Sequence, residues 1–317
     1  MSDAVQRSYH YANGRVSVLS VKLLTNEKLQ KVAECATLEG ALKILHDAGY
    51  AGGMTLSDAN EFERLLRREW ESVLAFVESA TAEKAATDCF LLAADVRNLK
   101  ALMKQKYLRS ADSVSVERGL FDVKAAEFAV MNDDYSFLPD ELSGAMEEID
   151  EEFYKGNRKP FVIDALLSKA YYKTVLRFLK KCKSPEIREY FLVEIDCKNL
   201  LSKFRAKKAG LPEDYFESMF IEGGNLKREG GAWEKIVETA NEELRGGTAF
   251  VQTERLCKNL QREIIFPHRT DVDGILPLVN YFLAKQTETE NLRLALVCIK
   301  NKVDKGKIMQ RLRELYV

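Results

Sequence analysis

Proline and glycine are scarce in this sequence, with 6 prolines and 17 glycines among 317 residues. Leucine, alanine, glutamate and lysine are plentiful instead, and this balance favours helix over sheet. A convincing strand pattern is also missing, because the alternating stretch SVSVERG at 113–119 is too short and isolated to form a sheet. The sequence therefore predicts an all-α protein.

An excess of charge of one sign is absent as well. Lysine and arginine number 48 against 49 for aspartate and glutamate, which gives a net charge of −1. A dedicated nucleic-acid binder normally has a clear basic excess, so we expect no nucleic-acid partner. The longest apolar runs, near CFLLAA and GILPLVNYFLA, are too short to cross a bilayer. Since the sequence also starts without a signal-peptide pattern, we expect a cytoplasmic chain with no membrane span.

Patterns for metal, cofactor or nucleotide sites are missing too. The six cysteines form no C-x-x-C pair and the three histidines stand apart, which predicts free buried thiols and no metal site. The loop G-x-x-x-x-G-K-[ST] of P-loop proteins does not occur. The glycine doublets have no strand before them and are predicted to be turns between helices: Gly52-Gly53, Gly223-Gly224, Gly230-Gly231 and Gly246-Gly247.

What the sequence does contain is one phrase that occurs three times. Each copy is an acid, two further residues and then Asn-Leu, set in an apolar stretch typical of a helix. In order, the copies are Asp95, Asn98 and Leu99; Asp196, Asn199 and Leu200; and Glu288, Asn291 and Leu292. We call these nine residues the signature.

The repeated phrase predicts three related helical repeat units, with approximate limits 1–112, 113–212 and 213–317. This period is too long for a TPR or HEAT array and indicates triplication of a small helical bundle. An apolar stripe over 5–23 predicts one long first helix, although Asn13-Gly14 within it usually marks a hairpin turn. Expected caps of later helices are Thr37 and either Ser57 or Asp58.

The acid and the asparagine of each copy lie on one face of a helix, because they are three residues apart. A structural interpretation is that they bond backbone groups or an arginine on an adjacent element and set the packing register. The alternative is a general acid–base site.

Two charged stretches also have two interpretations each. The basic stretch 97–109 suits a helix C-terminal half or an acidic partner, and the acidic stretch 146–153 suits a solvated face or a partner-facing patch.

Taken together, these stretches resemble the C subunits of the archaeal and bacterial V/A-type rotary ATPases and their eukaryotic relative, the d subunit of the V-ATPase. The similar segments are the three signature stretches, YANGRVSVLSVKLL near the start, YAGG at 50–53 and VIDALLSKAYY at 162–172. Around 273–283 the chain departs from the family pattern, which has a Gly-Pro-rich lead and a Gly-Tyr pair. The resemblance spans the whole chain.

The resemblance implies a mechanical function. Such subunits are non-catalytic parts of the central stalk, built from three similar helical domains around a pseudo-threefold axis as a funnel or socket. The implied partners are the D/F-type central-shaft subunits and the cytoplasmic face of the membrane proteolipid ring, with no cofactor. Two alternatives stay open at the level of sequence: an unrelated all-helical scaffold, and a helical enzyme that uses carboxylates.

Overall fold

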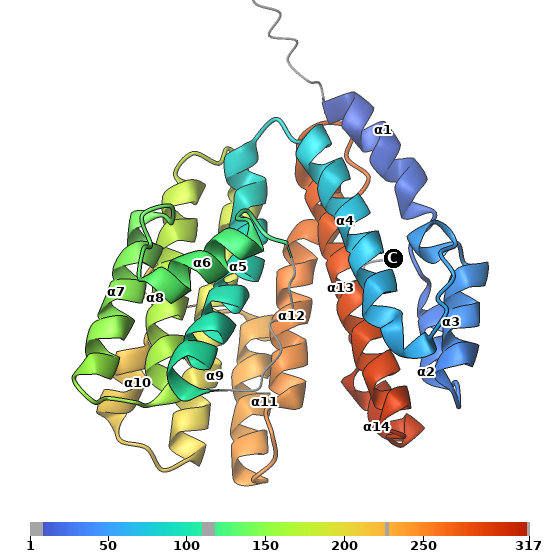
Figure 1. The fold of residues 1–317 in the computed structure, drawn as a ribbon. Coiled ribbons are helices and arrows are strands. Elements are labelled where there is room, and N and C mark those ends of the chain that lie inside the picture. Colours follow the sequence, from blue (N-terminus) through green and yellow to red (C-terminus); the bar gives the residue numbers. More distant parts are fainter. Residues whose placement is uncertain (1–8, 110–117, 226–227, 316–317) are drawn as a thin grey trace, which may run out of the picture. The chain divides into compact units, whose positions relative to one another are not determined.

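The computed structural model describes residues 9–109, 118–225 and 228–315, and every regular element in these ranges is a helix (Figure 1). The predicted all-α class is confirmed. The chain divides into two compact units. Unit 1 combines the two ends of the chain, Met1–Lys84 and Ile265–Val317, and unit 2 is Ala85–Ile264. The alternating stretch 113–119 lies largely outside the described residues.

Unit 1 contains the first helices of the chain and the last ones. They are α1 (Tyr9–Ser20), α2 (Asn26–Ala33), α3 (Leu38–Asp47), η1 (Tyr50–Gly52), η2 (Ala59–Glu61), α4 (Phe62–Ala80), η3 (Phe266–His268), α13 (Leu276–Lys300) and α14 (Lys305–Arg311). The most extensive helix contact pairs α13 with α4. A shared core joins leucines and alanines of α2 and α3 to the C-terminal half of α13, so the two ends of the chain fold together.

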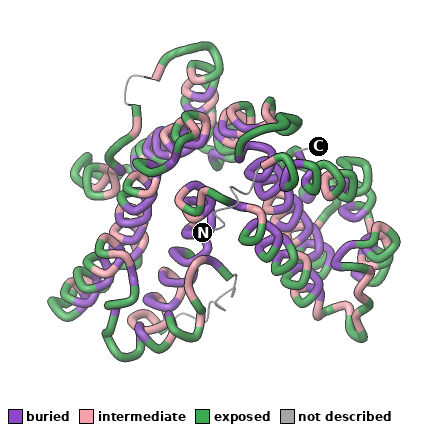
Figure 2. The backbone as a smooth tube through the Cα atoms, turned by 90° about the horizontal axis from the view of Figure 1, so that it is seen from above, coloured by how far each residue is buried: buried purple, intermediate pink, exposed green. Residues whose placement is uncertain are grey.

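Unit 2 contains the helices of the middle of the chain. They are α5 (Lys84–Leu108), α6 (Val123–Asn132), α7 (Asp140–Tyr154), α8 (Pro160–Leu179), α9 (Pro185–Lys208), α10 (Glu213–Met219), α11 (Gly231–Arg245) and α12 (Val251–Ile265). The closest pair is α7 with α8, and α9 packs on α10 and α11. Buried and exposed residues alternate along the helices of both units (Figure 2).

The local signals in the sequence account for many helix boundaries. The side-chain hydroxyl of Thr37 accepts a hydrogen bond from the Gly40 N–H at 3.2 Å and caps α3, as predicted. Asp58 accepts from the Asn60 N–H at 2.8 Å and caps the short turn η2 that leads into α4. Gly223-Gly224 and Gly246-Gly247 lie at turns between helices, as predicted, whereas Gly52 ends η1 and Gly231 begins α11.

The first helix passes through Asn13-Gly14, so the apolar period prevails over the turn-forming dipeptide. The reason lies in a distant contact: the buried Asn13 amide donates to the backbone oxygens of Val272 at 2.9 Å and Gly274 at 3.1 Å. The helix ends at Ser20 rather than continuing to residue 23. Its predicted start at Val5 lies outside the described residues.

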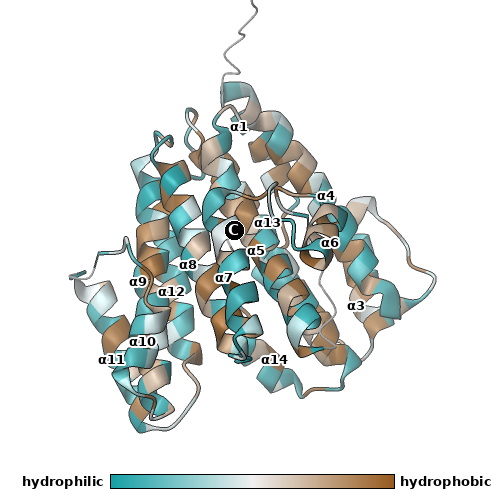
Figure 3. Cartoon of the chain, turned by 60° about the vertical axis from the view of Figure 1, so that its left-hand side comes forward, coloured by the Kyte–Doolittle hydropathy of each residue, from teal (hydrophilic) through white to brown (hydrophobic). Residues whose placement is uncertain are grey.

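Hydrophilic and hydrophobic residues are interspersed along the helices (Figure 3). Over the described residues, no helix has both the length and the apolar character required to span a bilayer.

Candidate functional site

The three signature copies lie on the three longest helices, α5, α9 and α13. Their polar side chains are all buried, with exposed fractions between 1% for Glu288 and 6% for Asn199. Leu99 and Leu292 are buried as well, and Leu200 is half-buried. The same residue types therefore lie at the buried face of three comparable helices.

The asparagines of the second and third copies bind backbone in the same way. Asn199 donates to the carbonyl of Ile221 at 2.8 Å and accepts from its N–H at 2.9 Å. Asn291 makes the same pair of bonds with Arg313, at 2.8 and 3.0 Å. Each partner lies 22 residues after its asparagine, directly beyond a short helix, α10 or α14. The side-chain amide of each asparagine thus forms both hydrogen bonds that a backbone peptide group could form, and it fixes the position of the returning chain.

The acids bind nearby backbone or a cation. Asp95 accepts from the N–H groups of Leu120 at 2.7 Å and Phe121 at 3.2 Å. The Asp196 carboxylate accepts from Arg228 Nε at 2.7 Å, which is an ion pair with little exposure. Buried polar groups need such partners, since an unmade hydrogen bond costs about 1–3 kcal/mol.

Glu288, the acid of the third copy, has partners of both kinds. Its carboxylate accepts from the Leu24 N–H and from Lys285 Nζ, each at 2.7 Å. Lys285 is itself 3% exposed and also donates to Glu69 at 2.7 Å. Glu69 in turn accepts from the Ala51 N–H at 2.9 Å, so this buried ion network ties α13, α4 and the start of the chain together.

Two glycines make room for the acids of unit 2. A Cβ on Gly119 would lie 2.4 Å from the Asp95 carboxyl group, and a Cβ on Gly224 would lie 2.1 Å from an Asp196 oxygen. Neither glycine has a left-handed φ, so space rather than backbone conformation requires them. The predicted turn at Gly223-Gly224 and the segment that contains Gly119 are therefore part of the signature's surroundings.

Burial shifts the pKa of all three acids upward. It raises the pKa of Asp95 to about 7, against the two backbone hydrogen bonds that lower it. Desolvation also raises the pKa of Asp196 and Glu288, opposed by Arg228 and Lys285 respectively. For Lys285, burial acts to lower the pKa, but the two neighbouring carboxylates outweigh it and the net shift is upward. Asp95 is thus the signature acid held mainly by neutral amides.

A groove of about 440 Å³ on unit 1 contains none of the nine signature residues. It lies between α3 and the segment before α4, and its lining comprises Glu39, Leu42, Lys43, His46, Met54, Thr55, Leu56, Ser57, Asp58, Ala59 and Leu65. Within the described residues, no group of three or more His, Cys, Asp or Glu side chains is arranged to hold a metal ion. The signature carboxylates are thus buried away from this groove.

A comparison with known protein families is decisive. The profile of the family described as ATP synthase (C/AC39) subunit matches residues 12–311. The chain belongs to this family. The resemblance noted in the sequence is thereby confirmed.

Relatives within the C/AC39 family occur in archaea and bacteria. The C subunit of the A-type ATP synthase of a Desulfurococcus species is 26% identical over 330 residues, covering 95% of this chain and 90% of the relative. That of Thermococcus gammatolerans is 28% identical over 229 residues, covering 69% of this chain and 62% of the relative. The C subunit of the V-type sodium ATPase of Enterococcus hirae is 18% identical over 333 residues, covering 97% and 99%.

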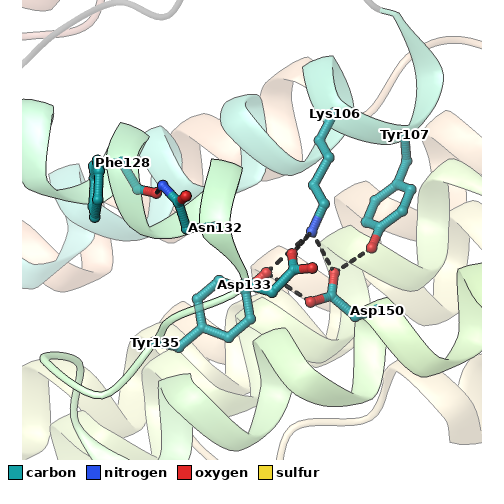
Figure 4. A network of polar contacts seen from close by, with 7 residues as sticks. All are labelled: Lys106, Tyr107, Phe128, Asn132, Asp133, Tyr135 and Asp150. Carbon is teal, nitrogen blue, oxygen red and sulfur yellow. Dashed lines mark hydrogen bonds and ion pairs between the residues drawn. The ribbon is translucent and has the colours of Figure 1, made fainter.

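The lysines of the basic stretch 97–109 of this C/AC39 family member bind within unit 2. Lys100 donates to Ser168 at 2.7 Å, and Lys104 pairs with Asp164 at 2.8 Å, both on α8. Lys106 reaches α7 and the turn before it, where it contacts Asp133, Asp150 and Tyr135 (Figure 4). Tyr107 and Tyr135 also donate to Asp150. Sequence reasoning missed these partners, because they lie on other helices.

The acidic stretch 146–153 on α7 has two sides. Glu147, Glu148 and Glu151 are exposed, whereas Asp150 is buried in the network around Lys106.

The cysteines agree with the prediction: all six are free and five of them are buried, with Cys35 half-buried.

Proposed function

We propose that this chain is a non-catalytic central-stalk subunit of a V/A-type rotary ATPase, a socket that couples the rotor shaft to the membrane proteolipid ring. The observation that carries the proposal is the use of the signature. Its acids are buried and bonded to the chain's own backbone or to a neighbouring cation, as are the asparagines of the second and third copies. Such contacts stiffen a helical body, which a torque-transmitting part needs.

The proposal includes two partners and a location. The D/F-type shaft subunits bind at one end and the cytoplasmic face of the proteolipid ring at the other, so that the socket is peripheral to the membrane. The three repeat units, 1–112, 113–212 and 213–317, surround a pseudo-threefold axis. The names of the relatives, ATP synthase and sodium ATPase subunits, support membership of such a complex.

The two alternatives fit the molecule less well. A carboxylate enzyme needs its acid within reach of a substrate, and Asp95, Asp196 and Glu288 are each at most 5% exposed. An unrelated scaffold is at odds with the family match over residues 12–311.

The test is to remove the chain from cells and assay the membranes. Without a coupling socket, we expect ATP-driven ion pumping to disappear while the detached catalytic head still hydrolyses ATP. Adding back the purified chain should restore pumping. Pumping that persists without the chain, or substrate turnover by the purified chain alone, would refute the proposal.

A further inference from the structure

Helix α1 has a second apolar face that the rest of unit 1 does not cover. Its inner face is buried through Ala12, Asn13 and Val16. On the outside, Tyr11 is 76% exposed and Val18 is 64% exposed. Val21, in the turn that follows, is 85% exposed. Exposed apolar residues that form a row on one element mark contact sites more often than scattered ones do.

The row has the spacing of a coiled-coil seam. Within α1, Tyr11, Gly14 and Val18 follow one another at steps of three and four residues, the a, d and next a positions of a heptad, and Val21 extends the row into the turn after Ser20. A helix that presents such a row fits a second helix laid along it. A lipid surface would accept any apolar face and does not need this spacing.

Gly14 gives a further argument for close contact with a partner. It lies within α1 and is exposed, and a Cβ added to it would meet no atom within 4 Å. Glycine inside a helix is destabilising relative to alanine, yet nothing in the described packing requires it here. At the centre of the seam, it allows another backbone to approach α1 closely.

The charges beside the seam are positive. Between Tyr9 and Lys22 the sequence contains no acid. Arg15 follows the d residue Gly14 and so occupies an e position of α1, where charged pairs select a partner, and Lys22 adds a positive charge in the turn beyond the helix. Arg15 also lies over the Phe76 ring at 4.7 Å, which holds its guanidinium near the seam. An acid that faces α1 from the loop before α13 is Asp273, and it pairs with His10 at 2.9 Å.

From these observations we propose that α1 docks an α-helix of another protein in the complex, with apolar residues at a and d and acidic residues at e and g. The seam is Tyr11, Gly14, Val18 and Val21. A second copy of this chain is disfavoured as the occupant, because its own Arg15 and Lys22 would face like charges. Resting on the proposed function, the partner is a helix of the rotor shaft, so α1 is a point where torque enters the socket.

The first test is a photo-crosslinker placed at position 18 in the full complex, with one at the exposed Val251 of unit 2 as the control. We expect position 18 to crosslink to a shaft protein. Crosslinks to the proteolipid ring, to lipid or to a second copy would overturn the inference, even if the chain copurifies with the complex. If the chain does not copurify at all, the proposed function fails instead, and the next test judges the inference.

That test uses two synthetic helical peptides of three heptads each, both with leucine at a and d. One carries glutamate at e and g, and the other carries lysine. We expect the full chain to prefer the acidic peptide about tenfold or more, by fluorescence anisotropy at low salt. Arg15→Glu with Lys22→Glu should reverse this preference, which a merely structural role would not do.

A matched pair of variants completes the test. Val18→Asp should weaken acidic-peptide binding about tenfold, whereas Val251→Asp should not change it. Equal affinity for both peptides, or stronger binding to anionic phosphatidylserine vesicles than to the acidic peptide, would overturn the inference. Circular dichroism of each variant verifies that the helices are intact.

Discussion

The segment that enters α2 in unit 1 and the segment that enters α6 in unit 2 meet a signature acid in the same way. The Leu24 N–H donates to Glu288, and the Phe121 N–H donates to Asp95. The difference lies in the chain between donor and acceptor, which is 264 residues for the first bond and 26 for the second. In unit 1, the start of the chain therefore fills the place that a downstream segment fills in unit 2.

The correspondence continues along the two helices. Thr25 and Asp122, the residues directly after the two donors, are the N-caps, and each accepts from the N–H three residues on. The buried positions then match in order: Leu29, Val32 and Ala33 in α2, and Ala126, Ala129 and Val130 in α6. The third signature copy is thus completed by the N-terminal segment, and Leu24 lies outside the predicted range 213–317. The predicted limits of the repeat units stay a prediction.

The variant with the largest expected effect removes the cation beside the acid of the third signature copy. The residues three positions before the acids are Leu92, Val193 and Lys285. Lys285→Ala leaves Glu69 and Glu288 without their cation, so we expect unit 1 to lose about 3–5 kcal/mol of its free energy of unfolding. Urea denaturation followed by tryptophan fluorescence measures it.

Each unit contains one tryptophan as a fluorescence probe, and unit 2 also provides a control variant. Trp70 lies in unit 1 and Trp233 in unit 2, so Trp→Phe backgrounds report on each unit separately. Lys104→Ala, which removes a partly exposed pair with Asp164, should cost about 0–1 kcal/mol in unit 2. Equal losses for the two variants would show that the buried network is no stronger than a surface pair.

Sequence reasoning reached the local parts of this comparison and missed the long-range ones. Caps and periods act within a few residues, so Thr37, the course of α1 and the three signature helices were predictable. The bond from Leu24 to Glu288 has no local pattern, since its two groups are 264 residues apart. The ion network of Lys285 is weakly indicated in the sequence by a lysine that directly follows the largely apolar run at 276–284 and lies three residues before Glu288.

The second prediction compares Asp95, the signature acid bound mainly by backbone amides, with the two signature acids that also bind a cation. Burial holds the pKa of Asp95 at about 7, against an ordinary value of 3.8. Between these values the folded state retains a proton that the unfolded state has released. Stability from Asp95 is therefore present at low pH and is lost as the pH rises to 7, by about 4 kcal/mol at most.

Asp95→Asn cannot ionise, so the variant should lack this contribution. The measurement is the difference in free energy of unfolding between wild type and Asp95→Asn, followed from pH 4 to pH 8 by denaturation. Asp134→Asn is the control. Hydrogen bonds with Ser136 lower the pKa of Asp134, so its contribution has the opposite sign and is lost as the pH falls. If the difference in free energy of unfolding between wild type and Asp95→Asn does not change with pH, the raised pKa of Asp95 is contradicted.

The third prediction tests the space that the acids need in unit 2. Gly119→Ala and Gly224→Ala would each place a Cβ against a buried carboxylate, and we expect each to cost about 1–3 kcal/mol. Gly144→Ala in α7 is the matched control, because a Cβ there would meet nothing within 4 Å. It should stabilise unit 2 by about 0.5–1 kcal/mol. If all three substitutions act alike in chemical denaturation, the acids do not require the glycines.

The smallest expected effect concerns the exposed faces of α2 and α6. Where α2 and its C-cap expose Lys31 and Glu34, the matching positions of α6 hold Phe128 and Met131, which are 66% and 81% exposed. The buried positions of the two helices agree, so the fold itself does not require these apolar side chains. Placing the α2 residues on α6, as Phe128→Lys with Met131→Glu, should therefore change the free energy of unfolding by less than about 0.5 kcal/mol.

Denaturation followed by Trp233 fluorescence, in a Trp70→Phe background, measures this change. Val130→Lys is the control. Val130 is 3% exposed, and a lysine there would bury an unpaired charge, so unit 2 should be strongly destabilised. If the double variant also loses more than about 1 kcal/mol, the outer face of α6 is packed in the free chain and its correspondence with α2 ends at the buried positions. If stability is unchanged, the two helices are interchangeable in the fold and differ in the surface that they present.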